Sequence, residues 1–262
     1  MSKEQTYRAV VEYDGTDFCG FQYQPQDRTV AGDLEVALSQ LFDEPIKIGA
    51  AGRTDAGVHA VGQVISFTTE RTFPIERLAL AANSLLPLDV SLREAALVAN
   101  GFSARLDARE RRYTYVIVNR SQPLAVLRRF SHHEHRALDL EALRRAANDF
   151  VGTHDFTTFC GIAPKDGNAE RTVYAVEVES DPPLLRLHFR ARGFLHRMVR
   201  VMTGTLLEIA SQRRAADSVP ALLAARDRAA GGMTAPAAGL FLVGVRYDDF
   251  DSNPTNTLPL GR

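Results

Sequence analysis

One short segment, Gly52-Arg53-Thr54-Asp55-Ala56-Gly57-Val58-His59-Ala60, places a single carboxylate between a cation and a histidine. Glycines and other small residues around Asp55 allow a sharp turn and the close approach of a large ligand. A neighbouring arginine favours the ionised form of a carboxyl group. An anionic Asp on an exposed turn suits a nucleophile or a base better than a proton donor. The alternative is a structural turn in which Asp55 pairs with Arg53.

Arginine is concentrated in two segments. Residues 105–129 hold seven arginines against Asp107 and Glu110, and residues 184–207 hold five with no acid. Acids elsewhere reduce the net charge to −1. Clustered arginine beside Tyr and Phe suits a phosphate backbone and unstacked bases, so we expect an anionic ligand of the RNA type. The candidate RNA-contacting residues are Arg105, Arg109, Arg111, Arg112, Arg128 and Arg129.

Composition limits the class of protein. The chain has 262 residues, of which 45% are hydrophobic and 24% charged, as in soluble globular proteins. Every apolar run is too short to span a membrane. The N-terminus lacks an apolar signal core, so we expect a cytoplasmic protein. Cys19 and Cys160 form no disulfide framework and no metal-ligand spacing, so we expect reduced thiols.

Hydrophobic periodicity predicts two similar halves. In the first, we expect strands at 6–13, 45–49, 62–68 and 88–98, with helices at 30–42 and 75–86. In the second, we expect strands at 112–119, 172–179, 184–191 and 240–247, with helices at 138–151, 195–210 and 221–229. Each half then reads as a split β-α-β unit.

The predicted fold is α+β, with two ferredoxin-like halves whose sheets join around a central basic active-site cleft. An N-terminal domain of residues 1–107 carries the Asp55 turn, and a C-terminal domain covers 108–250. Residues 251–262 form a polar, loosely held tail.

The sequence resembles the tRNA pseudouridine synthase A family over nearly its whole length. The resemblance is carried most specifically by GRTDAGVHAVGQV at 52–64. Further matching runs are YDGTDFCGFQYQ (13–24), RTV with the following LE (28–35), FSARLDARERRYTYVI (102–117), GTHDFTTFC (152–160), RTV (171–173), GFLHRMVRVMTGTLLEIA (193–210) and APAAGLFL (235–242).

The resemblance implies an isomerase that converts uridine to pseudouridine at positions 38, 39 and 40 of the tRNA anticodon stem-loop. It implies that Asp55 is the catalytic aspartate, with Arg53 and Arg200 near it. It also implies that Tyr113 packs against the target base and that Leu240 lines the pocket. Similar enzymes are homodimers that need neither metal nor cofactor.

The residues also allow other interpretations. Tyr113 could be a core aromatic of a strand, and Arg200, beside an apolar helix stripe, could extend to solvent. His59 could act as a base or as a metal ligand with Asp55, although no further ligands lie nearby. The run His132-His133-Glu134-His135 could bind a transition metal, but its arginine neighbours favour an RNA-facing loop.

The residues are compatible with three functions. The favoured one is the RNA-modifying isomerase, in which Asp55 adds to the sugar, adds to the base or first accepts a proton. A non-catalytic RNA-binding protein would use the same arginines but gives the Asp55 turn no role. A metal-dependent hydrolase would combine Asp55, His59 and residues 132–135, with no established ligand spacing.

Overall fold

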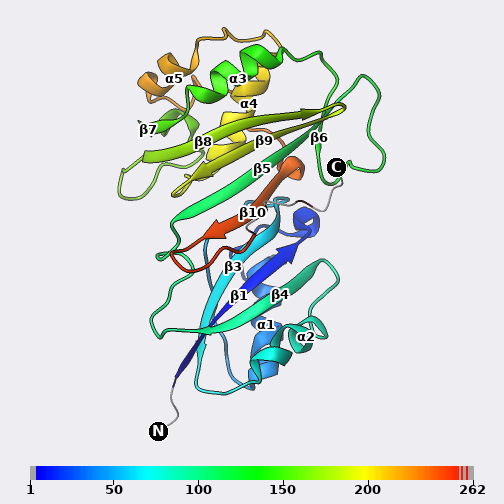
Figure 1. Ribbon diagram of the computed structural model, residues 1–262, viewed down its shortest axis with the longest axis vertical. Helices are drawn as coiled ribbons and strands as arrows, with labels where there is room; N and C mark the ends of the chain where they lie inside the picture. The colour runs from blue at the N-terminus through cyan, green and yellow to red at the C-terminus, as the bar shows by residue number, and fades with distance from the viewer. Residues whose placement is uncertain (1–3, 254, 256–257, 259–262) are drawn as a thin grey trace. The chain divides into compact units, whose positions relative to one another are not determined.

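A computed structural model describes residues 4–253, 255 and 258, and these form two compact units. Unit 1 contains residues 1–111 and 241–262, and unit 2 contains residues 112–240. The structure contains both helices and strands in each unit (Figure 1). Among the described residues, no helix has the length and apolar character that crossing a membrane requires.

The sheet of unit 1 has the strand order β4-β1-β3-β10, with β2 also paired to β3. Its strands are β1 (Gln5–Tyr13), β2 (Gly49–Ala50), β3 (His59–Thr69), β4 (Val90–Val98) and β10 (Leu240–Arg246). β1 is antiparallel to both β3 and β4, whereas β10 is parallel to β3. The central strands are built from β-branched and aromatic residues, which suit a buried pleated surface.

Two helices, α1 (Val30–Phe42) and α2 (Ile75–Asn83), cover one face of this sheet. Thr29 caps α1 by accepting a hydrogen bond from the Gly32 amide, and Asp43, in the left-handed region, follows its last turn. Phe42 packs edge-on against Tyr7 of β1, with ring centroids 5.4 Å apart. α2 packs on β4 and contacts α1, so both helices lie on the face that Tyr7 points to.

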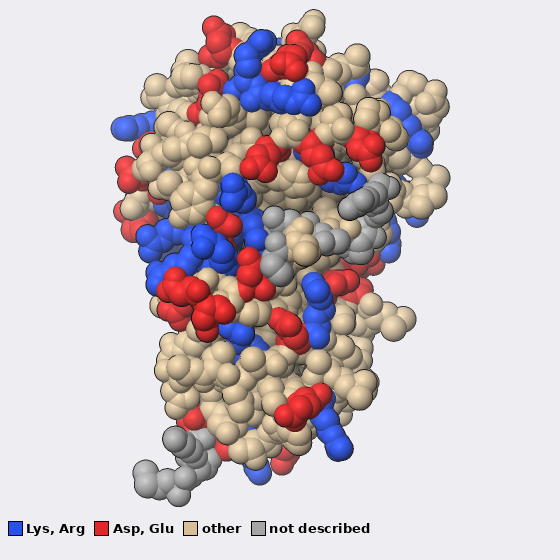
Figure 2. Space-filling view, viewed as in Figure 1, with Lys and Arg blue, Asp and Glu red and all other residues tan. Residues whose placement is uncertain are grey.

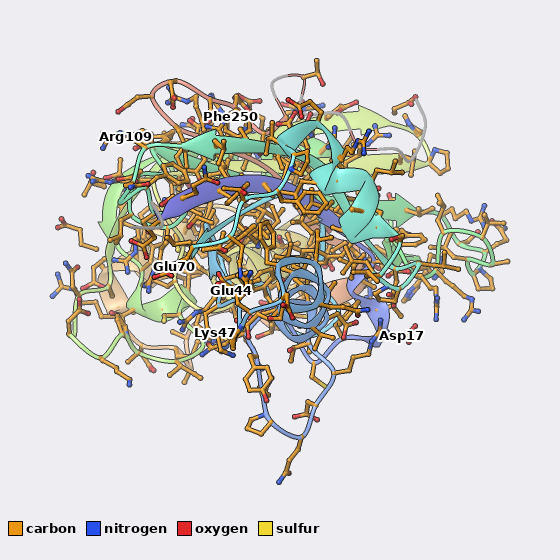
Figure 3. All side chains as sticks on the ribbon, turned by 90° about the horizontal axis from the view of Figure 1, so that it is seen from below. Asp17, Glu44, Lys47, Glu70, Arg109 and Phe250 are labelled. Atoms are coloured by element: carbon orange, nitrogen blue, oxygen red, sulfur yellow. The ribbon has the colours of Figure 1, made fainter. Side chains whose placement is uncertain are left out.

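The opposite face of the sheet is contacted by residues 247–250, which follow β10. Arg8, next to Tyr7 and therefore on the other side of the strand, lies 3.5 Å from the Phe250 ring centroid. Figure 3 shows Phe250 and Arg109 on one side of β1 and Lys47 and α1 on the other. On the helical side, the Glu70 amide donates to the Glu44 carboxylate at 3.2 Å (Figure 3).

The sheet of unit 2 has the order β5-β9-β8-β7, and β6 pairs with β5. Its strands are β5 (Glu110–Asn119), β6 (His132–Glu134), β7 (Gly152–Asp155), β8 (Glu170–Asp181) and β9 (Leu184–Ala191). β8 and β9 form an antiparallel hairpin across the predicted Pro182-Pro183 turn. The predicted strand pair at 172–179 and 184–191 is thus present, with the first strand longer at both ends.

The helices of unit 2 are α3 (Leu140–Asn148), α4 (Met198–Ala210) and α5 (Val219–Ala225). Asp139 caps α3 by accepting hydrogen bonds from the Glu141 and Ala142 amides. α4 lies behind β8 and β9 in Figure 1 and is apolar around nearly its whole circumference. All its residues are buried except Arg200 and Glu208, and Glu208 pairs with the Arg214 guanidinium at 2.9 Å.

Several predicted elements differ from the structure. The strand expected at 45–49 is reduced to Gly49–Ala50, because side chains of α1 take up the preceding amides. Ser39 Oγ accepts from the Ile46 amide at 2.8 Å, and Glu35 accepts from the Ile48 amide at 3.2 Å. α4 begins at Met198 rather than 195, since Arg197 has a left-handed backbone with φ 58°. β6 and β7, both short and polar, were not predicted.

The end of the chain also differs from the prediction. The sequence pattern assigns strand 240–247 to the second half, whereas residues 241–262 belong to unit 1, where Phe241 pairs with His59. The start of the predicted loose tail is tightly held: buried Ser252 donates to the Gly62 carbonyl and accepts from the Val245 amide, both at 2.8 Å. The tail predicted beyond residue 253 lies largely outside the described residues.

Candidate active site

The predicted catalytic residue Asp55 lies in the turn between β2 and β3 of unit 1. The Asp55 carbonyl accepts a hydrogen bond from the Val58 amide at 3.1 Å, which closes a four-residue turn. Gly57 has φ 77° within this turn, a conformation that glycine adopts without strain. The Asp55 side chain is neither fully buried nor fully exposed. The turn therefore presents the carboxylate from a defined backbone.

The segment after β1 supports the turn from the other side. The Phe21 amide donates to the Thr54 carbonyl at 3.0 Å, and the Gly57 amide donates to the Phe18 carbonyl at 3.4 Å. Gly20 has φ 97° where it passes the Thr54 carbonyl. Residues 15–21 and 52–58 thus form one hydrogen-bonded layer, although they are far apart in the sequence.

His59 is a structural residue in this geometry. Its side chain is 1% exposed, and its Nδ1 accepts from the Gly15 amide at 3.0 Å. Its ring stacks on Phe241, with centroids 4.8 Å apart. Asp14, whose carboxylate lies 3.2 Å from Nδ1, also binds the amide and hydroxyl of Thr16. These contacts give the alternative of a base or metal-ligating His59 no support.

Arg53, predicted to lie near Asp55, has an exposed side chain on the same turn. The Arg53 side chain is therefore accessible to solvent and to a ligand bound at the Asp55 turn.

Tyr113 lies on β5 of unit 2 and is 9% exposed. Its ring meets that of Phe194 at a right angle, with centroids 5.3 Å apart. Phe194 belongs to the segment that leads into α4. Tyr113 is thus largely a packed aromatic, with a small exposed part.

Arg200 lies in the first turn of α4 and does not simply extend to solvent. Its Nε donates to the Ala235 carbonyl at 2.8 Å, and the Ala235 amide donates to the Arg200 carbonyl at 3.0 Å. The nearby Tyr115 hydroxyl donates to the Pro236 carbonyl at 2.8 Å. Arg200 and Tyr115 therefore fix the segment that leads to Leu240, which is 5% exposed.

The predicted RNA-contacting arginines fall into two groups. Arg105, Arg128 and Arg129 are exposed, and so is Arg109, which forms an ion pair. The others are engaged or covered: Arg109 pairs with Asp248 at 2.7 Å, Arg111 donates to the Ala51 and Ala108 carbonyls, and Arg112 is 6% exposed. Basic and acidic side chains are intermingled on the face drawn in Figure 2. The exposed group is thus the better candidate for phosphate contact.

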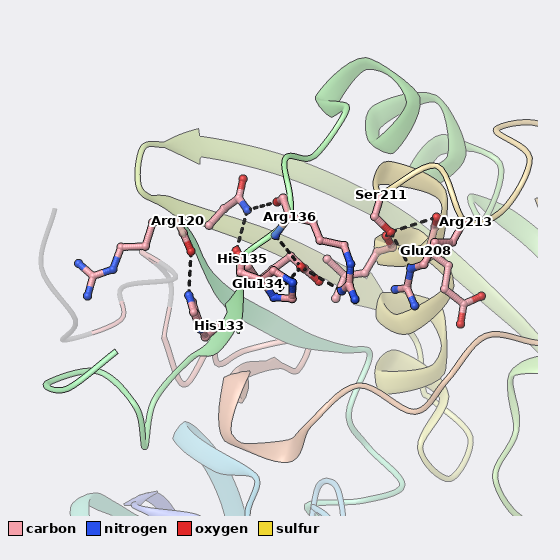
Figure 4. Close-up of polar contacts among 10 residues, drawn as sticks. Arg120, His133, Glu134, His135, Arg136, Glu208, Ser211 and Arg213 are labelled. Carbon is pink, nitrogen blue, oxygen red and sulfur yellow. Dashed lines mark hydrogen bonds and ion pairs between the residues drawn. The ribbon is translucent and has the colours of Figure 1, made fainter. Parts of the chain in front are cut away.

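The histidine run at 132–135 is part of a polar cluster in unit 2 (Figure 4). His133 Nε2 lies 2.8 Å from the Arg120 carbonyl oxygen. Buried Glu134 accepts from the Arg136 amide at 2.9 Å and from its guanidinium at 3.3 Å. Within residues 4–253, 255 and 258, no group of three His, Cys, Asp or Glu side chains is arranged to hold a metal ion. The cluster thus organises the loop after β5.

Two polar residues beside the Asp55 turn had no predicted role. Tyr13 and Gln63 are both buried and bind the turn at Thr54 and Gly52. Gln63 could have been noticed, because it is the one amide in the otherwise apolar or small run Ala60–Ser66. Its partner could not be read from spacing, since β1 and β3 meet only in the folded sheet.

The match to a family model decides the classification. The model for the tRNA pseudouridine synthase family covers residues 9–105 and 146–248, well over half the chain. The chain belongs to the tRNA pseudouridine synthase family. This isomerase converts uridine to pseudouridine in tRNA. Asp55, Arg53, Arg200 and Leu240 lie inside the matched ranges, whereas Tyr113 lies between them.

Curated relatives agree with this assignment. The synthase is 45% identical to "tRNA pseudouridine synthase A" of Moorella thermoacetica over 242 residues, covering 92% of this chain and 98% of the relative. It is 43% identical to the protein of that name from Halalkalibacterium halodurans, covering 88% of each chain. The Bacillus subtilis protein of that name is 38% identical, with 92% and 99% covered. The resemblance inferred from the sequence motifs is therefore confirmed.

A solved structure, of the archaeal box H/ACA sRNP Nop10-Cbf5 complex, is more distant from the synthase. It is 13% identical with a TM-score of 0.32, and the match covers 77% of this chain and 44% of that one.

Proposed function

We propose that the synthase modifies uridines 38, 39 and 40 in the tRNA anticodon stem-loop, with Asp55 as its catalytic residue. The observation that supports this most is the Asp55 turn, where a partly exposed carboxylate sits on a backbone fixed by hydrogen bonds from two segments. A reacting group held in one orientation avoids the entropic cost of positioning it at each turnover.

The reaction itself needs only acid–base and nucleophilic chemistry. The N1–C1′ bond breaks, the uracil rotates, and a C5–C1′ bond forms. The proton on C5 is lost and N1 gains a proton, so atoms and charge balance with no external donor of groups or electrons. Asp55 can add to C1′ of the sugar, add to the uracil ring, or accept a proton before the glycosidic bond breaks.

The remaining site residues act on the same uridine in this proposal. Arg53 and Arg200 balance the negative charge of Asp55 and orient it. Tyr113 stacks against the uracil once the base has left its helical stack. Leu240 forms an apolar part of the pocket wall.

Further parts of the proposal concern assembly and RNA contact. The exposed arginines Arg105, Arg128 and Arg129 contact phosphates, with a smaller contribution from Arg109, Arg111 and Arg112. The enzyme acts as a cytoplasmic homodimer without metal or cofactor. Each half is a ferredoxin-like unit, which the order β4-β1-β3-β2 in unit 1, antiparallel throughout, supports.

Asp55→Asn tests the catalytic assignment. In this variant the release of tritium from tRNA labelled at C5 of uridine should stop, while the melting temperature and the Kd for tRNA stay unchanged. Glu76→Gln, which neutralises an exposed carboxylate on α2 of the same unit, should retain full turnover. Retained turnover in Asp55→Asn would falsify the assignment. A wild-type protein that binds tRNA yet forms no pseudouridine would instead favour RNA binding without catalysis.

A further inference from the structure

Three buried polar side chains form a connected group beneath the Asp55 turn. Tyr13, at the end of β1, is 3% exposed; Thr54 is 7% exposed; and Gln63, on β3, is fully buried. The Tyr13 hydroxyl lies 2.8 Å from Thr54 Oγ1, and Gln63 Nε2 donates to the Tyr13 hydroxyl at 3.4 Å. The three side chains thus link two strands of unit 1 to the residue that precedes Asp55.

Gln63 binds the backbone at the start of the same turn. Its Nε2 donates to the Gly52 carbonyl at 2.7 Å, and its Oε1 accepts from the Gly52 amide at 3.4 Å. Oε1 also accepts from its neighbouring amide, Val64, at 3.2 Å. One side-chain amide therefore fixes both polar groups of Gly52. A glycine left unrestrained would allow the turn many backbone conformations.

Thr54 is held at two points. Its side chain binds Tyr13, while its carbonyl accepts from the Phe21 amide at 3.0 Å. Rotation about the backbone at Thr54 would break one of these contacts. Because Asp55 is the next residue, the direction of its Cα–Cβ bond depends on the orientation of Thr54.

The hydroxyl of Tyr13 remains a hydrogen-bonding group at physiological pH. Burial raises its pKa to about 12, although the hydrogen bonds from Thr54 and Gln63 act in the opposite direction. A buried hydroxyl is costly unless it is hydrogen-bonded, and an apolar ring would fill the same space. A polar group in this position is therefore better explained by orientation of the turn than by packing alone.

We propose that Tyr13, Thr54 and Gln63 are positioning residues that set the orientation of the Asp55 carboxylate. The inference rests on the proposed function, because it assumes that Asp55 reacts. None of the three needs to touch the substrate. Their effect is on the rate of the chemical step, while tRNA binding depends on other residues.

Tyr13→Phe removes one oxygen atom and keeps the ring. We expect the single-turnover rate, measured with saturating enzyme and C5-tritiated tRNA, to fall at least tenfold. The Kd for tRNA should stay within twofold. Tyr7→Phe is the matched control, because Tyr7 is a buried tyrosine of the same strand whose hydroxyl binds Gln5 and the Phe73 amide, away from the turn. The rate of Tyr7→Phe should equal the wild-type rate, even if its melting temperature falls as much as that of Tyr13→Phe.

Thr54 provides a second, independent pair of variants. Thr54→Val removes the hydroxyl and keeps the shape, so its rate should fall as in Tyr13→Phe. Thr54→Ser keeps the hydroxyl, so its rate should stay close to the wild-type rate. In the double variant Tyr13→Phe/Thr54→Val the loss should be no larger than in the more affected single variant, because both changes break the same contact. If Tyr13→Phe does not fold, the Val and Ser pair carries the test.

The outcomes separate this inference from the proposed function. Rates within twofold of wild type in Tyr13→Phe and Thr54→Val, with Asp55→Asn inactive, would overturn the positioning role and leave Asp55 catalytic. An active Asp55→Asn would overturn the proposed function itself. A fall in melting temperature with an unchanged rate in both variants would assign the group to stability alone.

Discussion

A β-carbon added to Gly15 would overlap the carbonyl oxygen of Val58. The two residues meet where the segment after β1 crosses the end of the Asp55 turn, and the Gly15 amide is the donor to His59 Nδ1. The close approach of the two backbones is therefore possible only without a side chain at residue 15.

Gly15→Ala should displace residues 52–58 and lower the turnover of tRNA at least tenfold, with a fall of several degrees in melting temperature. Gly49→Ala is the control, because its β-carbon would lie 3.4 Å from Ser66 Oγ, an ordinary contact. Steady-state tritium release and thermal unfolding measure both effects. Equal activity of the two variants would contradict the predicted clash.

The Arg28–Asp89 pair should make stability depend on pH. The Arg28 guanidinium binds both oxygens of Asp89, at 2.7 and 2.8 Å, and this holds the pKa of Asp89 below its ordinary value. A lowered pKa stabilises the folded state above the unfolded value of about 4, and this contribution disappears as the pH falls through the folded pKa. Asp89→Asn should thus cost on the order of 1 kcal/mol at pH 7.

Urea denaturation of wild type and Asp89→Asn between pH 3 and 8 measures this difference. We expect the difference in free energy of unfolding between the two proteins to be constant above pH 5. This difference should decrease as the pH falls further. Glu12→Gln breaks an ion pair of 4.0 Å between Glu12 and Arg93, two half-exposed side chains. Its free energy of unfolding should differ little from that of wild type at any pH. A gap that widened toward low pH would be inconsistent with the lowered pKa.

Tyr113→Leu should slow the reaction by removing an aromatic face while retaining much of the buried volume. Stacking of a base on an aromatic ring contributes about 1–3 kcal/mol, equivalent to a rate or affinity loss of roughly five- to 150-fold. Tyr174→Leu replaces a half-exposed tyrosine on β8 and should leave the rate unchanged. Single-turnover rates distinguish them, and a wild-type rate in Tyr113→Leu would exclude stacking.

Arg128→Gln/Arg129→Gln should weaken tRNA binding most at low salt. Each lost phosphate contact reduces the magnitude of the slope of log K, the tRNA association constant, against log salt concentration by about 0.7–0.9. The slope of the double variant should therefore be smaller in magnitude by up to about 1.8. Filter binding between 50 and 200 mM salt measures the slope. Arg77→Gln, an exposed change on α2, should leave it unaltered. An unchanged slope in the double variant would remove these residues from the RNA contact.

Ser252→Ala should destabilise unit 1 by about 1–3 kcal/mol, because it leaves the Gly62 carbonyl and the Val245 amide unsatisfied in a buried position. Ser84→Ala, whose hydroxyl binds the Ala81 carbonyl at the exposed end of α2, is the control. Equal unfolding midpoints for the two variants would indicate that the two hydrogen bonds of the Ser252 hydroxyl contribute no stability.

Local sequence patterns predicted most elements and the residues of the Asp55 turn. Helix 30–42 has the predicted bounds, because its cap at Thr29 and its apolar stripe are local signals. The prediction of a strand at 45–49 was wrong for residues 45–48. Ser39 and Glu35 of α1 accept hydrogen bonds from amides of this segment, an interaction that exists only after folding. The support of the turn by Tyr13 and Gln63 was missed for the same reason. Tertiary pairing, rather than local preference, decides these positions.

The path of the chain through the two units affects how the protein is made. Residues 112–240 of unit 2 are contiguous and leave the ribosome together, so their folding need not await the rest. Unit 1, in contrast, lacks β10 until the residues that follow unit 2 have been synthesised. A nascent chain arrested before residue 241 would therefore expose the β10-facing edge of β3, the site at which chaperones or aggregation would act on the unfinished enzyme.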